Sequence, residues 1–84
     1  MWIPPTLRAS ANADGLVLLN TDTGEIFTSN AIGSRIWQLL EEGRGEAEIA
    51  ADLAKAYGRP QAVVADDVHE FIGGLIGLGA RPVL

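Results

Sequence analysis

Residues 14–37 read DGLVLLN, then TDTG, then EIFTSN and finally AIGSRIW. The continuous apolar run LVLL is expected of a strand that is covered on both faces or central in a sheet. Gly24 can take the positive φ that a short hairpin loop requires, and EIFTS after it suits a second strand. Ser29 and Asn30 are both good helix N-caps. The stretch therefore predicts an antiparallel hairpin that leads into a helix.

A further strand is expected before this hairpin. Residues 7–11 alternate between apolar and polar side chains, and the sequence NADG after them is a turn signal. If this strand pairs with the other side of residues 16–19, the second strand is central and residues 25–29 lie at an edge of the sheet. The outer backbone N–H and C=O groups of an edge strand are unpaired. The sequence thus predicts an edge to which an extended peptide can be added.

Three helices are expected after the sheet. Residues 1–6, before the first strand, are expected to be an irregular lead-in. The first helix should end at Gly43, the second at Gly58, and the third should run from Pro60 to about Leu78. The third helix has a wider apolar arc than one core face needs. This order predicts an α+β fold with a three-stranded antiparallel sheet followed by three helices. Such a fold is winged helix-turn-helix-like and, over residues 1–84, a single domain.

Composition and charge exclude several kinds of function. The hydrophobic fraction of 48% supports a folded core, while no apolar run is long enough to span a membrane and no signal peptide is evident, so we expect a cytoplasmic protein without a membrane partner. The chain has no cysteine, which removes thiolate catalysis and cysteine zinc sites. Its net charge of −5, with scattered Lys and Arg, opposes nucleic-acid binding.

Catalytic chemistry also finds little support. His69 is the only histidine, and we expect it to face solvent with Asp66 as a possible partner. Asp66 and Asp67 are adjacent in a predicted helix and diverge by about 100°, so they do not form a paired-carboxylate site. We therefore predict no catalytic residue, no metal site, no cofactor and no enzymatic activity.

The chain resembles the family of pyrroloquinoline quinone biosynthesis protein D, whose members are also known as RiPP precursor peptide recognition elements. The resemblance covers nearly the whole chain and rests on the order and spacing of several short motifs. These motifs are DGLVLL at 14–19, TGEIF at 23–27, NAIGSRIWQLL at 30–40, EIAADL at 48–53 and DVHEFI at 67–72.

The resemblance implies that the chain binds the leader segment of a ribosomally synthesised precursor peptide. The leader is added as a strand to the third β-strand, beside the third helix, and is presented to a separate modifying enzyme. Within the family, the chain looks most like the stand-alone leader-binding protein of lasso-peptide biosynthesis, which implies a cysteine-protease-like maturation enzyme as its partner. The implied peptide-binding residues are Glu25, Ile26, Phe27, Thr28 and Ser29 on the strand and Val64, Asp67, Val68, Phe71, Ile72 and Leu75 on the helix.

Other interpretations remain open at this point. One is a peptide chaperone of the PqqD type in quinone cofactor biosynthesis. Another is a winged-helix DNA-binding regulator, although residues 61–78 contain no Lys or Arg. A third is a structural subunit whose sheet edge pairs with another copy or with a partner protein.

Overall fold

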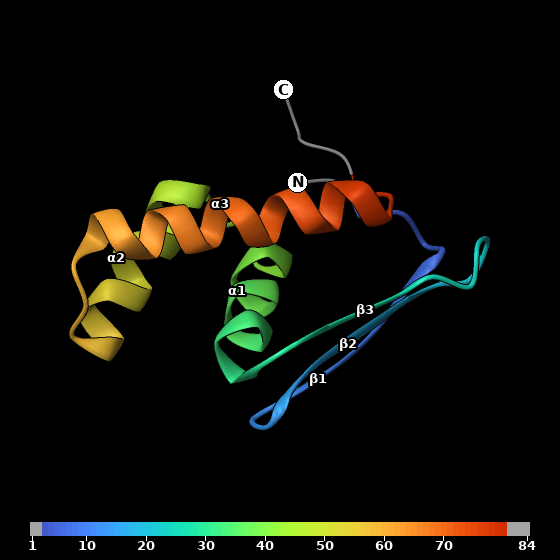
Figure 1. Cartoon of the computed structure of the whole chain (residues 1–84), viewed down its shortest axis with the longest axis horizontal. Helices are drawn as coiled ribbons and strands as arrows, with labels where there is room; N and C mark the ends of the chain where they lie inside the picture. Colours follow the sequence, from blue (N-terminus) through green and yellow to red (C-terminus); the bar gives the residue numbers. More distant parts are fainter. Residues whose placement is uncertain (1–2, 81–84) are drawn as a thin grey trace.

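The chain folds as three strands followed by three helices (Figure 1), as the sequence predicted. The structure is a computed structural model that describes residues 3–80, so Met1 and Trp2 of the expected lead-in lie outside the described residues. The elements are β1 (Leu7–Asn12), β2 (Gly15–Asn20), β3 (Ile26–Ser29), α1 (Ala31–Glu41), α2 (Glu46–Tyr57) and α3 (Gln61–Leu78).

The sheet is antiparallel with the order β1-β2-β3, so β2 is central and β3 forms one edge. Residues pair across β2 and β3 from Leu16 with Ser29 to Leu19 with Ile26. Gly24 has a φ of 76° in the connecting turn, as its position suggested. The central position of β2 is confirmed, but coverage on both faces is wrong, because its side chains alternate between buried and exposed. Only one face of the sheet is covered by helices.

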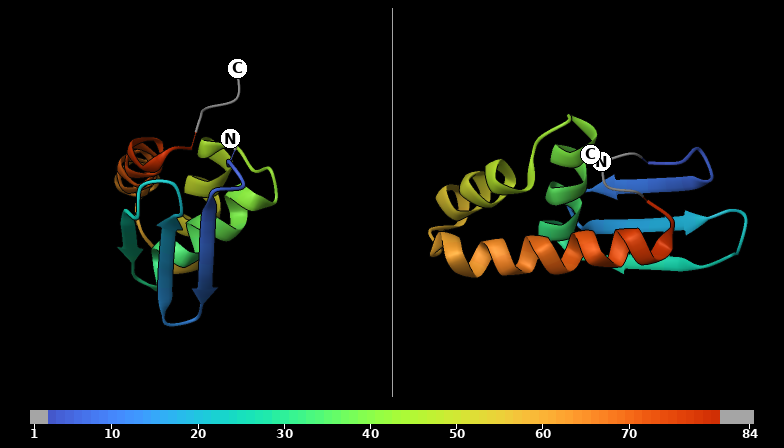
Figure 2. Two further views of the ribbon diagram at one scale, coloured as in Figure 1. Left: turned by 90° about the vertical axis from the view of Figure 1, so that its right-hand side faces the viewer. Right: turned by 90° about the horizontal axis from the view of Figure 1, so that it is seen from above.

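Two helices, α1 and α3, cover the inner face of the sheet, and α2 packs on α3. Asn30 caps α1, since its side-chain oxygen accepts a hydrogen bond from the Gly33 N–H at 3.0 Å. Figure 2 shows α3 running beside β3 and over the edge of the sheet. The C-terminal end of α3 is tied to the sheet by a buried hydrogen bond of 2.7 Å, which Asn20 Nδ2 donates to the Leu78 carbonyl. The position of α3 relative to β3 is therefore fixed by packing and by a specific polar contact.

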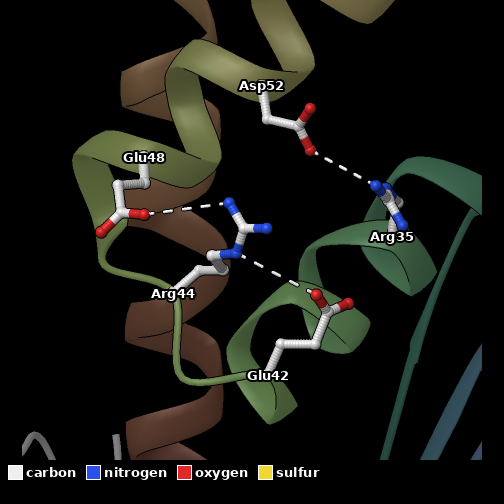
Figure 3. A network of polar contacts seen from close by, with 5 residues as sticks. All are labelled: Arg35, Glu42, Arg44, Glu48 and Asp52. Carbon is white, nitrogen blue, oxygen red and sulfur yellow. Dashed lines mark hydrogen bonds and ion pairs between the residues drawn. The ribbon is translucent and has the colours of Figure 1, made fainter.

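Exposed ion pairs lie between α1, α2 and the connection that joins them (Figure 3). Arg35 contacts Asp52 at 3.4 Å, and Arg44 reaches Glu42 at 4.0 Å and Glu48 at 3.9 Å. Exposed pairs of this kind contribute at most about 1 kcal/mol each. These pairs help to orient the connection between α1 and α2. They engage Arg35 and Arg44, two of the six basic residues of the chain, away from β3.

Candidate functional site: the groove between β3 and α3

The free edge of β3 presents two residues whose backbone groups point away from the sheet. The Asn20 N–H donates to the Glu25 carbonyl at 2.9 Å, which shows that the backbone carbonyl of Glu25 points toward β2. In an antiparallel pair the orientation alternates along the strand. Phe27 and Ser29 therefore also direct their N–H and C=O groups toward β2, whereas Ile26 and Thr28 direct theirs outward. These outward groups can pair with an added strand.

A groove of about 760 Å³ lies beside this edge, between β3, the start of α1 and α3. It is open to solvent and combines aromatic, aliphatic and charged side chains. The residues that line it are Phe27, Ser29, Asn30, Ile32, Gly33, Ile36, Arg59, Asp67, Glu70, Phe71 and Gly74.

An aromatic pair lines the groove. The rings of Phe27 and Phe71 meet edge to face, with centroids 5.5 Å apart and planes at 81°, a preferred geometry for aromatic side chains. Two glycines make room for this pair. A Cβ at Gly74 would lie 2.8 Å from Phe27 Cε2, whereas one at Gly33 would collide first with the Ser29 side chain and would also lie 3.1 Å from Phe71 Cε2. Gly74 therefore makes room for the ring of Phe27 beside α3, and Gly33 lets α1 approach Ser29 and Phe71.

Charged side chains border the groove. Asp67 and Glu70 are three residues apart on α3, so they share one side of the helix, and both are exposed. Arg59 lines the same groove from the connection between α2 and α3. Within residues 3–80 none of these three side chains forms an ion pair. The border therefore carries two carboxylates and one guanidinium whose charges are available to a ligand.

A family model described as Coenzyme PQQ synthesis protein D (PqqD) matches residues 15–80 of the chain. The chain belongs to the PqqD family. This membership confirms the resemblance to the RiPP recognition elements that the sequence motifs suggested. Comparison with curated protein sequences gave no match.

Two solved structures resemble this PqqD-family chain over almost its full length. The first is TbiB1 in complex with the TbiA(beta) leader peptide, which is 35% identical, with 92% of this chain and 90% of that chain covered and a TM-score of 0.81. The second is lasso peptide synthetase B1 complexed with the leader peptide, which is 26% identical, with 94% of each chain covered and a TM-score of 0.83. Both are described as complexes with leader peptides.

The strand residues that the PqqD resemblance implied divide between three places. Phe27 and Ser29 line the groove. Ile26 and Thr28 point their side chains to the outer face of the sheet and their backbone groups to the open edge. Glu25 precedes β3, is exposed, and has its carbonyl engaged by β2. The expected strand therefore contributes both its backbone and its inner side chains to the site.

The helix residues are positioned less uniformly. Asp67 and Phe71 line the groove. Val64 and Val68 lie behind it and border a small cavity of about 20 Å³ toward α2, and Leu75 is fully buried in the core. These three side chains support the groove wall from within and do not present surface to it.

Ile72 lies on the opposite flank of α3. Five residues separate it from Asp67, which places the two side chains about 140° apart around the helix. Ile72 packs against the core and is not among the residues that line the groove, and Ile76 on the same flank is exposed. The apolar arc of α3 is therefore widened on the side away from β3.

Several groove residues had no signal in the sequence analysis. Arg59 lies in a connection, and the residues at the start of α1 reach the groove only because α1 begins directly after β3. Glu70 could have been found, because it stands three residues after Asp67. The residues that were missed are Asn30, Ile32, Gly33, Ile36, Arg59, Glu70 and Gly74.

His69 lies outside the groove. His69 is exposed, and its Nδ1 lies 2.9 Å from Glu46 Oε1 on α2, so the expected contact with Asp66 is wrong. No group of three or more acidic or histidine side chains in residues 3–80 could hold a metal ion. In the same part of the chain, no helix is long and apolar enough to cross a membrane.

Proposed function

We propose that this protein binds the leader segment of a ribosomally synthesised precursor peptide by strand addition to β3 and delivers it to a separate modifying enzyme. The enzyme we assign is the leader protease of lasso-peptide maturation. The observation that carries this proposal is the open β3 edge beside a lined groove, in a family member whose solved relatives are described as leader-peptide complexes.

Backbone pairing supplies affinity that does not depend on the leader sequence. The outward groups of Ile26 and Thr28 offer donors and acceptors to an extended peptide. Each backbone hydrogen bond contributes about 0.5–1.5 kcal/mol net. Residues of β3 include no Lys, Arg or Pro, the residues that commonly protect an edge strand from pairing. The edge is therefore suited to accept a further strand.

The groove supplies selectivity. Every second residue of an added strand faces the same side, so the inward side chains of the leader meet α3 and the start of α1. An aromatic or aliphatic leader residue fits against Phe27, Phe71 and Ile32, all of which line the groove. A basic leader residue fits beside Asp67 and Glu70. These contacts hold a peptide in place, and the proposal leaves the chemistry to a separate enzyme.

A binding titration tests leader recognition. A fluorescein-labelled synthetic leader of the precursor encoded beside the gene, and the TbiA(beta) leader as a second probe, are titrated with the protein and followed by anisotropy. Trp37 is buried and does not line the groove, so an external label is the better reporter. We expect saturation at micromolar concentration or below, and none with a scrambled leader. If no leader encoded near the gene gives saturable binding, the proposal is contradicted.

Paired variants at Thr28 test the edge assignment. Thr28→Pro removes an outward N–H that β2 does not use, so the fold should survive while leader affinity falls. Thr28→Val keeps the N–H and should bind like the wild type. Proline at Phe27 is less informative, because the Phe27 N–H faces β2 and its loss would disturb the sheet itself.

Delivery is tested with the partner enzyme. The rate of leader removal by the cysteine-protease-like enzyme encoded nearby is measured with and without this protein. We expect faster cleavage when the wild-type protein is present and no acceleration with Thr28→Pro. Equal rates in all three reactions would leave leader binding intact but contradict delivery to that enzyme.

A second candidate function is favoured by the description of the matching family model. In that case the chain would act as a peptide chaperone in quinone cofactor biosynthesis, and its peptide would be the precursor of that cofactor. Competition of each unlabelled peptide with the fluorescein-labelled leader for binding to the protein distinguishes the candidates. Displacement by the lasso-type leader, and not by the quinone precursor, supports the first assignment.

A further inference from the structure

The outer face of the sheet carries an apolar surface that the groove does not explain. Val17 is 46% exposed, Leu19 is 36% exposed and Ile26 is 66% exposed. Leu19 and Ile26 are direct partners in the register, so their side chains lie next to each other on this face. Helices cover only the inner face, so no described element packs over these three side chains.

The polarity of this face changes from one edge of the sheet to the other. The register aligns Arg8 on β1, Leu19 on β2 and Ile26 on β3 in one row across the sheet. The row is charged at the β1 edge and apolar at the β3 edge. An added strand beside β3 would place its own outward residue next in this row, immediately after Ile26.

We propose that this row is a second selectivity surface for the leader, and that Ile26 selects a large apolar residue on the outward side of the bound strand. The inference rests on the proposed strand addition, because only an added strand brings a side chain beside Ile26. Neighbouring strands lie about 4.8 Å apart, and directly opposite side chains are in contact. Recognition is then two-sided, with inward residues in the groove and an outward residue on Ile26.

The open edge of β3 and the apolar end of the row at Ile26 both suit the same ligand, an added leader strand. The outward N–H and C=O groups of Ile26 direct a ligand backbone to this residue, and the exposed side chain offers that ligand an apolar neighbour. Val17 lies on the central strand, in the row of Ser10 and Thr28. A leader strand would be about 10 Å from β2, which leaves Val17 outside direct contact. Val17 is therefore a matched control for Ile26.

The experiment couples a charge at Ile26 to a charge in the leader. Ile26→Glu, Ile26→Thr and Val17→Glu are titrated with the fluorescein-labelled leader encoded beside the gene and with single-lysine variants of that leader at successive positions. Ile26→Thr should bind the unmodified leader about twofold to fivefold more weakly, as expected for loss of an apolar cross-strand pair. Ile26→Glu should also bind it more weakly and should regain affinity when lysine occupies one position, or two positions that are two residues apart. Val17→Glu should bind like the wild type, and thermal melts check that all three variants are folded.

The outcomes separate this inference from the proposed function. Rescue of Ile26→Glu confined to leader positions of one parity supports the outer-face contact. Wild-type binding together with unchanged affinity of the Ile26 variants, or with rescue at no position, overturns the inference and leaves leader recognition standing. An equal loss in Val17→Glu also overturns it, because the effect would then come from the sheet as a whole. Failure of the wild-type protein to bind any leader removes both.

Discussion

Three glycines of α3 illustrate how much the consequence of a residue depends on its exact position. From the sequence, Gly73, Gly74 and Gly77 each weaken a helix interior, and their small size suits either close approach of another backbone or simple helix packing. In the structure a Cβ at Gly73 or Gly77 meets open space, whereas a Cβ at Gly74 would collide with the ring of Phe27. The same residue type therefore has different consequences a single position apart.

Replacing these glycines with alanine should separate binding from stability. Gly73→Ala should raise the free energy of unfolding by about 0.5–1 kcal/mol and leave leader affinity unchanged. Gly74→Ala should displace Phe27 from Phe71, which weakens leader binding and offsets the gain in helix stability. Urea unfolding and the anisotropy titration measure the two effects. Equal behaviour of both variants would contradict the assigned contact.

Strands, turns and helices were largely predictable from the sequence, but their relative placement was not. The hairpin around Gly24 and the helix start after Asn30 follow from local chemistry. The flank of α3 that faces β3 depends on how the helix crosses the sheet, and a wide apolar arc does not specify it. Without this information, the sequence analysis included Ile72 among the peptide-binding residues and omitted Glu70. In the structure Glu70 lines the groove and Ile72 does not.

Asn20 determines part of this placement and should be sensitive to substitution. Its Nδ2 donates to the Leu78 carbonyl, and its Oδ1 accepts from the Asp22 N–H at 2.9 Å. Asn20→Ala should lower the free energy of unfolding by about 1–3 kcal/mol, because a buried carbonyl loses its donor. Asn12→Ala is a control, since the Asn12 side chain accepts similar turn hydrogen bonds from Asp14 and Gly15, both outside α3. Urea unfolding should show a smaller loss for Asn12→Ala, and an equal loss would contradict this role of Asn20.

Charge acts at the scale of the whole molecule. The net charge is −5, and Asp67 and Glu70 border the groove without ion-pair partners in the described part of the chain. A basic leader is then attracted over distances comparable to the Debye length, which is about 8 Å at physiological ionic strength. The sequence already indicated the overall sign of this charge, while the position of Asp67 and Glu70 beside the groove required the structure.

Salt should therefore weaken leader binding mainly through the association rate. Stopped-flow association of a leader containing Lys or Arg is measured at several salt concentrations for the wild type and for the double variant Asp67→Asn, Glu70→Gln. The wild type should associate more slowly as salt rises, and the double variant should show a shallower dependence. A double variant in which exposed Asp14 and Asp22 are replaced by Asn has the same net charge and should resemble the wild type. Identical salt dependence in all three would contradict a role for the groove carboxylates.

Strand addition to β3 is tested most directly by a backbone scan of the leader. One amide nitrogen of the synthetic leader is methylated at a time, which removes one donor and leaves the side chains unchanged, and the affinity of each peptide is measured by anisotropy. The outward groups of Ile26 and Thr28 lie two residues apart, so affinity should fall by up to about tenfold at alternate leader positions and change much less between them. Uniform tolerance of methylation, or losses without a two-residue period, would contradict strand addition at this edge.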